Sequence, residues 1–308
     1  MQLYRSFLFV PGHRAEWIAK APKYGADALL LDLEDACPVE YKVAARETVR
    51  NGIADLAARN VAAFVRINAT DTGLSSGDLE AIVSPGLKGV MIPKLETVTQ
   101  IIQLDAWMEH FERKAGMDIG AVKIYGIPET ALGLKDAYAL ASALPRVACV
   151  INAAGARAGD VNKALGNRWT QEGRETEYVL QHILLANRAA GVEYPITAGN
   201  LDVTDQSLAR IQMGKLRNIG YRGMLVIHPS AVPIANEVFS PSREEIEWQR
   251  GVVIAMAEAV EKGLSAVTYD GMMIDYAHVR NALDLLAQAR AFGMEVGDVP
   301  AMELMSFK

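Results

Sequence analysis

The chain has 308 residues, of which 51% are hydrophobic and 22% are charged, a composition typical of a large globular protein. Lys plus Arg number 31 and Asp plus Glu number 37, so the formal net charge is −6. This mild acidity argues against a nucleic-acid-binding protein, which would need a basic face.

The sequence contains no sign of a membrane or secreted protein. No apolar stretch reaches the roughly 20 residues that a membrane helix needs, and the N-terminal apolar run is too short for a signal peptide. Cys37 and Cys149 lie in or beside apolar runs and form no CxxC pair, so we expect two buried, reduced thiols. We therefore expect a cytoplasmic protein without a membrane partner.

Eight short apolar runs alternate with longer segments of helical periodicity. The runs, read as strands, are residues 6–10, 28–33, 62–67, 89–93, 122–127, 147–152, 194–197 and 223–228. The segments read as helices are residues 40–58, 97–114, 134–143, 172–190 and 205–218. Continuous apolar strands separated by helices indicate a parallel sheet covered on both faces. Eight such units predict a TIM (β/α)8 barrel, with a doubly wound open sheet as the alternative.

The chain continues beyond the eighth unit. We expect the barrel to occupy residues 1–240 and a C-terminal helical extension to occupy residues 241–308. In the extension, Ser242 and Glu245 form a capping box that opens a helix of about 242–262, and a last helix covers about 277–292. The stretch between these helices reads as irregular, and its acidic residues make it a candidate lid over an active site.

Charged residues follow several of the predicted strands. Because the active site of a TIM barrel lies at the carboxyl ends of its strands, these residues are expected to share one rim. They are Asp32, Glu34 and Asp35 after the second strand, Arg66 in the third, Lys94 after the fourth, Glu129 after the fifth and Asp160 after the sixth.

Glu129 and Asp160 follow successive strands. Two carboxylates from neighbouring strand ends can bind Mg²⁺ and leave positions open for a substrate. The alternative is that each residue caps the helix that follows it, as Asp160 could do for a helix beginning at Val161. Arg66 lies inside an apolar strand and needs an anionic partner, either a substrate carboxylate or Glu34. His228, before Pro229, is interpreted as a structural histidine rather than a base.

Seven short motifs, in this order, resemble the HpcH/HpaI aldolase and citrate lyase β-subunit-like family over nearly the whole chain. They are RSFLFVPG (5–12), GADALLLDLEDA (25–36), VRIN (65–68), MIPKLE (91–96), IPETALGL (127–134), VIHPS (226–230) and DGMMID (270–275). The resemblance implies a TIM barrel, a Mg²⁺ cofactor and a homotrimer or hexamer. It also implies lyase or synthase chemistry on a 3-hydroxyacyl-CoA thioester.

The resemblance assigns roles to individual residues. It implies that Glu129 and Asp160 hold Mg²⁺ and that Arg66 binds the carboxylate of a 2-oxo acid. It implies that Asp275, supplied by a neighbouring subunit, is the catalytic acid or base, and that Arg14 contacts a CoA phosphate. The chain departs from the family at Arg157, Met224 and Met272. Family members often have lysine at the last two positions, which we expect to lie near the rim.

The sequence therefore predicts reversible Claisen-type or aldol-type cleavage of a substrate such as malyl-, citramalyl- or citryl-CoA, giving a 2-oxo acid and an acyl-CoA. In this hypothesis Asp32, Glu34 and Asp35 orient Arg66 or metal-bound water. One alternative is a class II pyruvate aldolase that does not use CoA. Another is a citrate lyase β subunit that acts only in a complex with an acyl-carrier protein.

Overall fold

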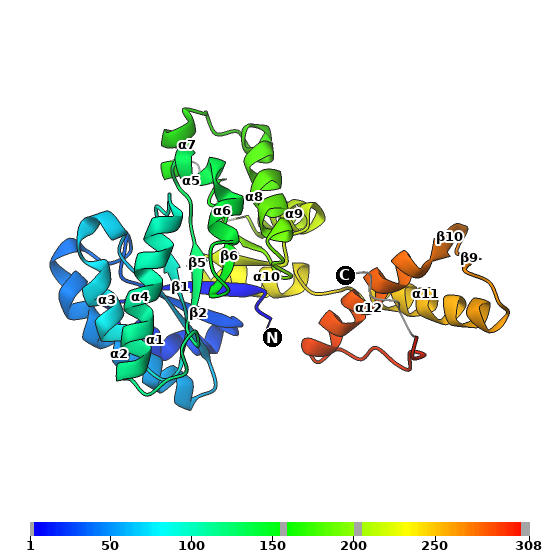
Figure 1. Cartoon of the computed structure of the whole chain (residues 1–308), viewed down its shortest axis with the longest axis horizontal. Helices are drawn as coiled ribbons and strands as arrows, with labels where there is room; N and C mark the ends of the chain where they lie inside the picture. Colours follow the sequence, from blue (N-terminus) through cyan, green and yellow to red (C-terminus); the bar gives the residue numbers. More distant parts are fainter. Residues whose placement is uncertain (1–2, 155–158, 200–204, 303–308) are drawn as a thin grey trace. The chain divides into compact units, whose positions relative to one another are not determined.

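The computed structural model describes residues 3–154, 159–199 and 205–302. The chain divides into two compact units (Figure 1). Tyr4–Phe239 form the first, and the chain from Ser240 onward forms most of the second. Each unit is described by itself. Arg157 and most of the loop before Asp160 lie outside the described residues.

The first unit contains a parallel sheet that nearly closes on itself. Its strands are β1 (Ser6–Pro11), β2 (Ala28–Asp32), β3 (Ala62–Arg66), β4 (Leu87–Ile92), β5 (Lys123–Gly126), β6 (Val147–Val150), β7 (Ile196–Thr197) and β8 (Gly223–Val226). Their order is β6-β5-β4-β3-β2-β1-β8-β7, and every pairing is parallel. A parallel bridge between Asn152 and Thr197 joins the two edges. The predicted barrel is confirmed.

Alternate residues of the strands fill two separate layers of core, as the two-residue period of a strand requires. One set points into the barrel, where the rings of Tyr4, Phe7, Phe64 and Tyr125 pack with centroids 5.0–6.3 Å apart. The other set, such as Leu29 and Leu31 of β2, packs outward beneath the helices. The barrel is therefore filled by side chains, and its chemistry must lie at its rim.

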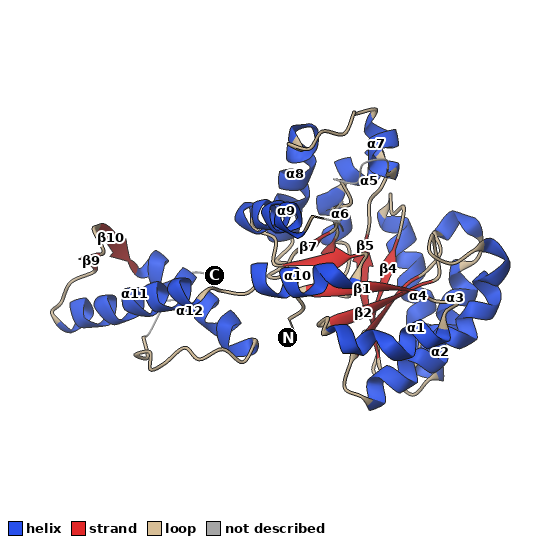
Figure 2. Cartoon of the chain, turned by 180° about the vertical axis from the view of Figure 1, so that it is seen from behind, coloured by secondary structure: helices blue, strands red, loops and turns tan. Residues whose placement is uncertain are grey.

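Helices surround the strands of this unit (Figure 2). The longer ones are α2 (Lys42–Ala58), α4 (Val98–Lys114), α8 (Glu177–Ala189) and α9 (Gln206–Ile219). The shorter ones are α1 (Ala15–Lys20), α3 (Ser75–Ile82), α5 (Ala131–Lys135), α6 (Ala137–Ala141), α7 (Asp160–Leu165) and α10 (Val232–Val238). The predicted helix 134–143 is two short helices, α5 and α6. The segments α1, α3 and α10 were not predicted, because one or two turns give too little periodicity to recognise.

The second unit has its own apolar core. α11 (Arg243–Glu261) packs on α12 (Tyr276–Ala291), and Val253, Met256 and Leu286 are fully buried between them. The stretch predicted to be irregular is instead an antiparallel hairpin of β9 (Ala266–Tyr269) and β10 (Met272–Asp275).

The reason for this error is the turn of the hairpin. Asp270 and Gly271 have φ angles of 47° and 75°, the left-handed pair that a tight Asp-Gly turn provides. The Asp-Gly pair was a signal for a hairpin, but the strands on either side of it are short.

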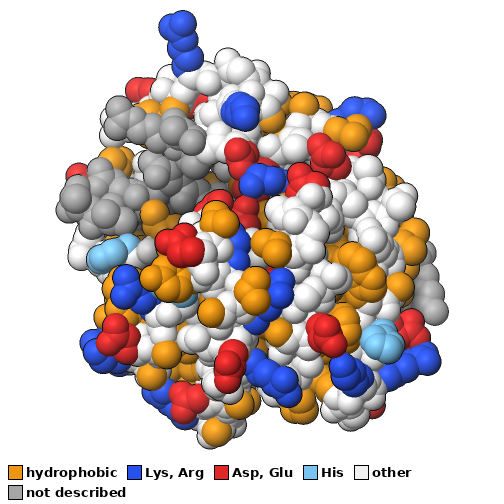
Figure 3. All heavy atoms as spheres, turned by 90° about the vertical axis from the view of Figure 1, so that its left-hand side faces the viewer, with side chains coloured by type: hydrophobic (Ala, Val, Ile, Leu, Met, Phe, Trp, Pro, Cys, Tyr) orange, Lys and Arg blue, Asp and Glu red, His pale blue; other side chains and the backbone are white. Residues whose placement is uncertain are grey.

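Three properties predicted from composition can be compared with the structure. Cys37 and Cys149 are buried and free of disulfides, as predicted. No helix among the described residues has both the length and the apolarity needed to cross a membrane. On the face drawn in Figure 3, acidic and basic side chains are interspersed, and neither sign forms a continuous patch there.

Candidate active site

Arg66 and Asp32 form an ion pair where two neighbouring strands end. The two residues lie opposite each other in the β2–β3 register. Nε and Nη2 of Arg66 donate hydrogen bonds to the two carboxylate oxygens of Asp32, at 2.7 and 2.6 Å. Nη1 lies 3.0 Å from Glu34 Oε2 and 3.5 Å from Asp35 Oδ2. The sequence left Glu34 or a substrate as the partner of Arg66; in the structure, Asp32 is its closest partner and Glu34 is a second.

Burial and neighbouring charges have opposing effects on the pKa values of Arg66 and Glu34. Burial alone would lower the pKa of Arg66, but its hydrogen bonds to Asp32 and the charges of Asp32, Glu34 and Asp35 raise it overall, so Arg66 is a permanent cation. Burial raises the pKa of Glu34, and the charge of Arg66 opposes that rise. Arg66 also lies over the ring of Phe9, 4.9 Å from its centroid. The guanidinium is thus fixed in one orientation.

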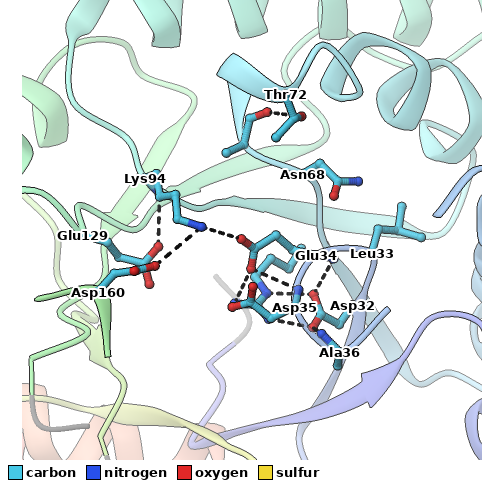
Figure 4. A network of polar contacts seen from close by, with 12 residues as sticks. Asp32, Leu33, Glu34, Asp35, Ala36, Asn68, Thr72, Lys94, Glu129 and Asp160 are labelled. Carbon is cyan, nitrogen blue, oxygen red and sulfur yellow. Dashed lines mark hydrogen bonds and ion pairs between the residues drawn. The ribbon is translucent and has the colours of Figure 1, made fainter. Parts of the chain in front are cut away.

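The loop that follows β2 is held rigidly. Asp32 accepts hydrogen bonds from the backbone N–H groups of Glu34 and Ala36, at 3.0 and 2.8 Å. From the first turn of α2, Lys42 donates to the carbonyls of Leu33 and Glu34, at 2.9 and 2.7 Å. These bonds, which Figure 4 shows in part, fix the acidic side chains next to Arg66.

Glu129 and Asp160 lie beside each other across the rim from Asp32 (Figure 4). Glu129 follows β5, and Asp160 is the first residue of α7. The helix-capping alternative is wrong for both residues. The N-cap of α5 is Thr130, whose hydroxyl accepts a hydrogen bond from the Gly133 N–H at 3.2 Å, and the N-cap of α7 is Gly159. Neither carboxylate therefore serves as a helix N-cap.

Gly133 lets the Glu129 loop pack closely against the end of β4. A Cβ atom at this position would lie 2.2 Å from the carbonyl oxygen of Leu95, which is backbone and cannot yield. Any larger residue would push α5, and with it Glu129, away from the rim.

The Glu129 carboxylate is poorly compensated by its own surroundings. Burial raises its pKa to about 7, and only the hydrogen bond from the Lys94 N–H, at 3.2 Å, and the charge of Arg66 oppose that rise. A partly buried carboxylate with so little compensation, beside a second carboxylate, suits a hard cation.

The donor set fits Mg²⁺ in particular. Among the described residues there is no cluster of three or more histidine, cysteine or carboxylate side chains suited to a metal. Mg²⁺ commonly takes one or two protein carboxylates and fills its other positions with water and substrate oxygens. Glu129 and Asp160 therefore satisfy what such a site requires.

Lys94 is a site residue whose role the sequence did not reveal. Its Nζ lies 2.9 Å from Glu34 Oε1 and 3.5 Å from Asp160 Oδ2 (Figure 4). The hydrogen bond to Glu34 raises the pKa of Lys94, so the side chain is cationic. Its φ of 52° is left-handed, which is rare for a residue other than glycine. The signals in the sequence were its position directly after a predicted strand and its place in the motif MIPKLE (91–96), and neither assigned it a role.

A cavity of about 960 Å³ opens above these residues. Asp32, Asp35, Arg66, Glu129 and Asp160 contribute to its wall, and so does the exposed His228. The Nδ1 atom of His228 contacts Ser230, 2.8 Å from its hydroxyl oxygen and 3.2 Å from its backbone nitrogen, as expected of a structural histidine.

One part of the cavity wall was not predicted. It is lined by two aromatic and two basic side chains, Trp17, Lys20, Lys23 and Tyr24. Arg14, which the sequence proposed for a phosphate, does not line the cavity; its Nε lies 3.1 Å from His13 Nε2 and its guanidinium lies over Trp17. These residues precede the second strand as single polar or aromatic positions, so no motif marked them.

Met224, one of the two departures from the family pattern, is fully buried on β8 in the outer core. Our expectation that it lies near the rim is wrong. Met272 is half exposed on β10 of the second unit.

Asp275 lies in the second unit, at the start of α12. It is the N-cap of that helix and accepts hydrogen bonds from the N–H groups of Ala277 and His278, at 2.9 and 3.4 Å. Its Oδ1 also contacts His278 Nδ1 at 2.8 Å. The contact with His278 lowers the pKa of Asp275, so its carboxylate is ionised at neutral pH. A solvent-exposed carboxylate with a fixed orientation can exchange protons.

Comparison with known proteins places this geometry in a family. The HpcH/HpaI aldolase/citrate lyase family matches residues 5–229, which include the whole rim described above. The chain belongs to this family. It is an enzyme of the lyase type.

Two relatives and two solved structures indicate the breadth of the family. A citrate lyase subunit beta-like protein of Deinococcus radiodurans is 35% identical, over 92% of this chain and 97% of its own. A (3S)-malyl-CoA thioesterase of Cereibacter sphaeroides is 30% identical, over 94% and 95%.

The solved structures are both from Mycobacterium tuberculosis. Protein CitE in complex with magnesium, acetoacetate and coenzyme A has a TM-score of 0.71 and 29% identity, covering 92% of this chain and 97% of its own. A citrate lyase beta subunit with oxaloacetate and magnesium has a TM-score of 0.63 and 30% identity, covering 78% and 98%. Structural neighbours of this chain are thus crystallised with magnesium, with coenzyme A and with an oxo acid.

Proposed function

We propose that this chain is a Mg²⁺-dependent carbon–carbon lyase that acts on a 3-hydroxyacyl-CoA thioester, such as malyl-, citramalyl- or citryl-CoA. Cleavage gives a 2-oxo acid and an acyl-CoA, and the reaction is reversible. One observation carries the proposal: the fixed guanidinium of Arg66 and the carboxylate pair Glu129 and Asp160 open onto one cavity. The carboxylate of one substrate can contact Arg66 while a neighbouring oxygen of the same substrate contacts a metal held by Glu129 and Asp160.

In this proposal Glu129 and Asp160 hold the metal. When bound, Mg²⁺ supplies a Lewis acid for the substrate oxygen that becomes a ketone. Magnesium in the two solved relatives supports this assignment. Asp32, Glu34 and Asp35 keep Arg66 ionised and correctly oriented.

Arg66 would bind the carboxylate of the 2-oxo acid part of the substrate. A guanidinium has five N–H donors: two of them donate to Asp32, and the Nη1 group faces Glu34 and Asp35. The second N–H of Nη2 is not used in these contacts and is available for a charge-assisted hydrogen bond to the substrate carboxylate. Because Arg66 is fixed on both sides, it orients the substrate without the entropic cost of ordering a free side chain.

Asp275 would complete the reaction as the acid and base. When the carbon–carbon bond breaks, the substrate hydroxyl loses its proton and becomes the ketone, and the electron pair of the bond remains on the thioester fragment as an enolate. Asp275, ionised at the start, would take up that proton and deliver it to the enolate carbon. In the synthetic direction Asp275 removes the same proton. We propose that it acts in the active site of a neighbouring subunit, in a homotrimer or hexamer.

The test is lyase turnover with malyl-, citramalyl- and citryl-CoA, with and without Mg²⁺, for the wild type and for Glu129→Gln and Asp275→Asn. We expect wild-type turnover to require Mg²⁺ and both substitutions to reduce it by at least 100-fold, within the range for loss of a catalytic acid or base, about 10²–10⁴-fold. Unchanged turnover in both variants would refute the proposal.

The products distinguish the proposed reaction from a second candidate. The similarity to a malyl-CoA thioesterase favours hydrolysis of the thioester as that candidate. A lyase releases a 2-oxo acid together with an acyl-CoA, whereas a thioesterase releases free CoA and the hydroxy acid. A class II aldolase would cleave substrates that lack CoA, and a citrate lyase β subunit would need its acyl-carrier protein. Assays on the isolated chain separate all four.

A further inference from the structure

Lys94 lies between the two halves of the site. Its ammonium group contacts Glu34, the partner of Arg66, and Asp160, one of the two carboxylates proposed for Mg²⁺. Its backbone N–H donates to Glu129, the other carboxylate. One residue therefore contacts both carboxylates, through two different groups, and also the acid that supports Arg66 (Figure 4).

The backbone of Lys94 is bent to make these contacts possible. Lys94 follows β4, and its φ of 52° is left-handed. Residues other than glycine adopt this conformation at a cost in energy, and such residues concentrate at functional sites. The next N–H, of Leu95, returns to the ladder by donating to the Ile127 carbonyl at 3.2 Å. Pro93 and Lys94 thus form a short turn after β4, and the left-handed φ in this turn belongs to Lys94, the residue that faces the acids.

The contacts of Lys94 differ in how firmly they are held. The pair with Glu34 is short, at 2.9 Å, and Glu34 is buried. The pair with Asp160 is longer, at 3.5 Å, and both side chains there are partly exposed. The ammonium is therefore anchored on Glu34 and reaches toward Asp160. Lys94 is not among the residues that line the cavity.

We infer that Lys94 is a positioning residue that sets the spacing of the two metal-binding carboxylates. Its backbone N–H orients Glu129, and its ammonium, anchored on Glu34, orients Asp160. Residues that orient metal ligands typically change metal affinity or activity by about 10- to 100-fold when they are replaced. This inference rests on the proposed role of Glu129 and Asp160 in binding Mg²⁺.

The competing possibility is that the ammonium and Mg²⁺ oppose each other as like charges. If repulsion dominated, removal of the ammonium would strengthen Mg²⁺ binding. If positioning dominates, as we infer, removal would weaken it. The two readings therefore predict changes of opposite sign.

The experiment is calorimetric titration of the substrate-free protein with Mg²⁺ alone. Lys94→Met removes the ammonium and keeps the length of the side chain. Lys94→Gly also removes it but relieves the left-handed backbone, so it guards against loss of folding in the first variant. Lys88→Met is the matched control, because Lys88 is an exposed lysine of β4, the strand that Lys94 follows. Circular dichroism and thermal melting check that each variant is folded.

We expect both Lys94 variants to raise the Kd for Mg²⁺ by roughly 10- to 100-fold, and Lys88→Met to leave it unchanged. An unchanged or lower Kd in a folded Lys94→Met or Lys94→Gly protein would overturn the inference. Glu129→Gln separates this failure from that of the proposed function. If the wild type does not bind Mg²⁺, both proposals fall; if Glu129→Gln abolishes binding but the Lys94 variants bind normally, only the inference about Lys94 falls.

Discussion

If Glu129 binds Mg²⁺ as proposed, the affinity for the metal depends on pH near neutrality. Burial raises the pKa of its carboxyl group to about 7 in the metal-free chain. Between about pH 4.5 and pH 7, Glu129 is therefore protonated in the folded state and ionised in the unfolded state. For a carboxyl whose pKa is raised by folding, the stabilising contribution is complete below the unfolded pKa of 4.5 and is lost as the pH rises through about 7. A metal that binds the ionised form would replace that proton.

We predict that the gain in Tm from saturating Mg²⁺ is larger at about pH 8 than at about pH 6, since binding at the lower pH must first displace the proton. Thermal melting with and without Mg²⁺ measures this. Glu129→Gln has no carboxyl group to titrate and should show a small gain that does not change with pH. A gain in the wild type that is equal at both pH values would show that Glu129 is not a ligand.

The buried ion pair of Asp32 and Arg66 can be compared with an exposed Asp–Arg ion pair of the same chain. Asp32 is fully buried, and its bonds to Arg66 satisfy a charge that water cannot reach. Asp55 and Arg59 form a similar pair at 3.1 Å, but their side chains are 53% and 42% exposed. Removal of one charge from a buried pair leaves the other without compensation, whereas water compensates a pair at the surface.

We predict that Asp32→Asn lowers the free energy of unfolding by about 3 kcal/mol and that Asp55→Asn lowers it by less than about 1 kcal/mol. Urea unfolding of the two variants and the wild type measures the difference. Equal losses would mean that the Arg66 pair is not buried as the structure describes.

At the scale of single elements, Asp275 has a structural task besides its proposed chemical one. It is the N-cap of α12, and its carboxylate accepts hydrogen bonds from two backbone N–H groups. An asparagine is also a good N-cap, but an alanine is not. The two substitutions therefore separate the two tasks.

We expect Asp275→Asn and Asp275→Ala to lose turnover equally, because neither can exchange the proton. Only Asp275→Ala should lose stability, by about 1 kcal/mol. Turnover assays and urea unfolding of both variants provide the comparison. If Asp275→Asn retained turnover, the proton would have to come from another group.

The elements that the sequence predicted well are those that hydrophobicity alone determines. A parallel strand buried on both faces is a continuous apolar run, so β1 to β6 and β8 were recognised, as were the long helices. β7 was predicted as residues 194–197 but consists of Ile196 and Thr197 only. The short helices and the β9–β10 hairpin depend on turn chemistry over a few residues, which periodicity does not register.

The residues of the site also differ in whether the sequence could predict them. Charges at strand ends marked Asp32, Arg66 and Glu129 as neighbours, because the rim of a barrel collects strand ends. The role of Lys94 could not be predicted, since it depends on a left-handed backbone that a lysine rarely adopts. The contact between Asp275 and His278 was also missed, because it belongs to a helix cap that had been read as irregular chain.

The chain as a whole consists of two compact units, and the proposed reaction needs residues from both. Arg66 belongs to the first and Asp275 to the second. If Asp275 acts in the site of a neighbouring subunit, then a chain without Arg66 and a chain without Asp275 can complement each other. If both residues act within one chain, no mixture of the two variants contains a complete site.

We predict that Arg66→Met and Asp275→Asn are each inactive and that oligomers reassembled from an equal mixture regain about a quarter of the wild-type activity. In a randomly mixed ring, half of the sites keep Arg66, and half of these face an intact Asp275. Turnover of the mixture after joint refolding, with each variant refolded alone as the control, gives the answer. An inactive mixture of folded oligomers would mean that the site lies within one chain.

The central claim is that Glu129, Asp160 and Arg66 meet one substrate through Mg²⁺. A crystal structure of the wild-type chain with Mg²⁺ and a 2-oxo acid such as pyruvate tests it most directly. We predict a metal bonded to one oxygen each of Glu129 and Asp160 at about 2.1 Å, with the carboxylate of the 2-oxo acid in hydrogen-bonding distance of Arg66. A metal bound to other residues, or a 2-oxo acid bound away from Arg66, would contradict the account.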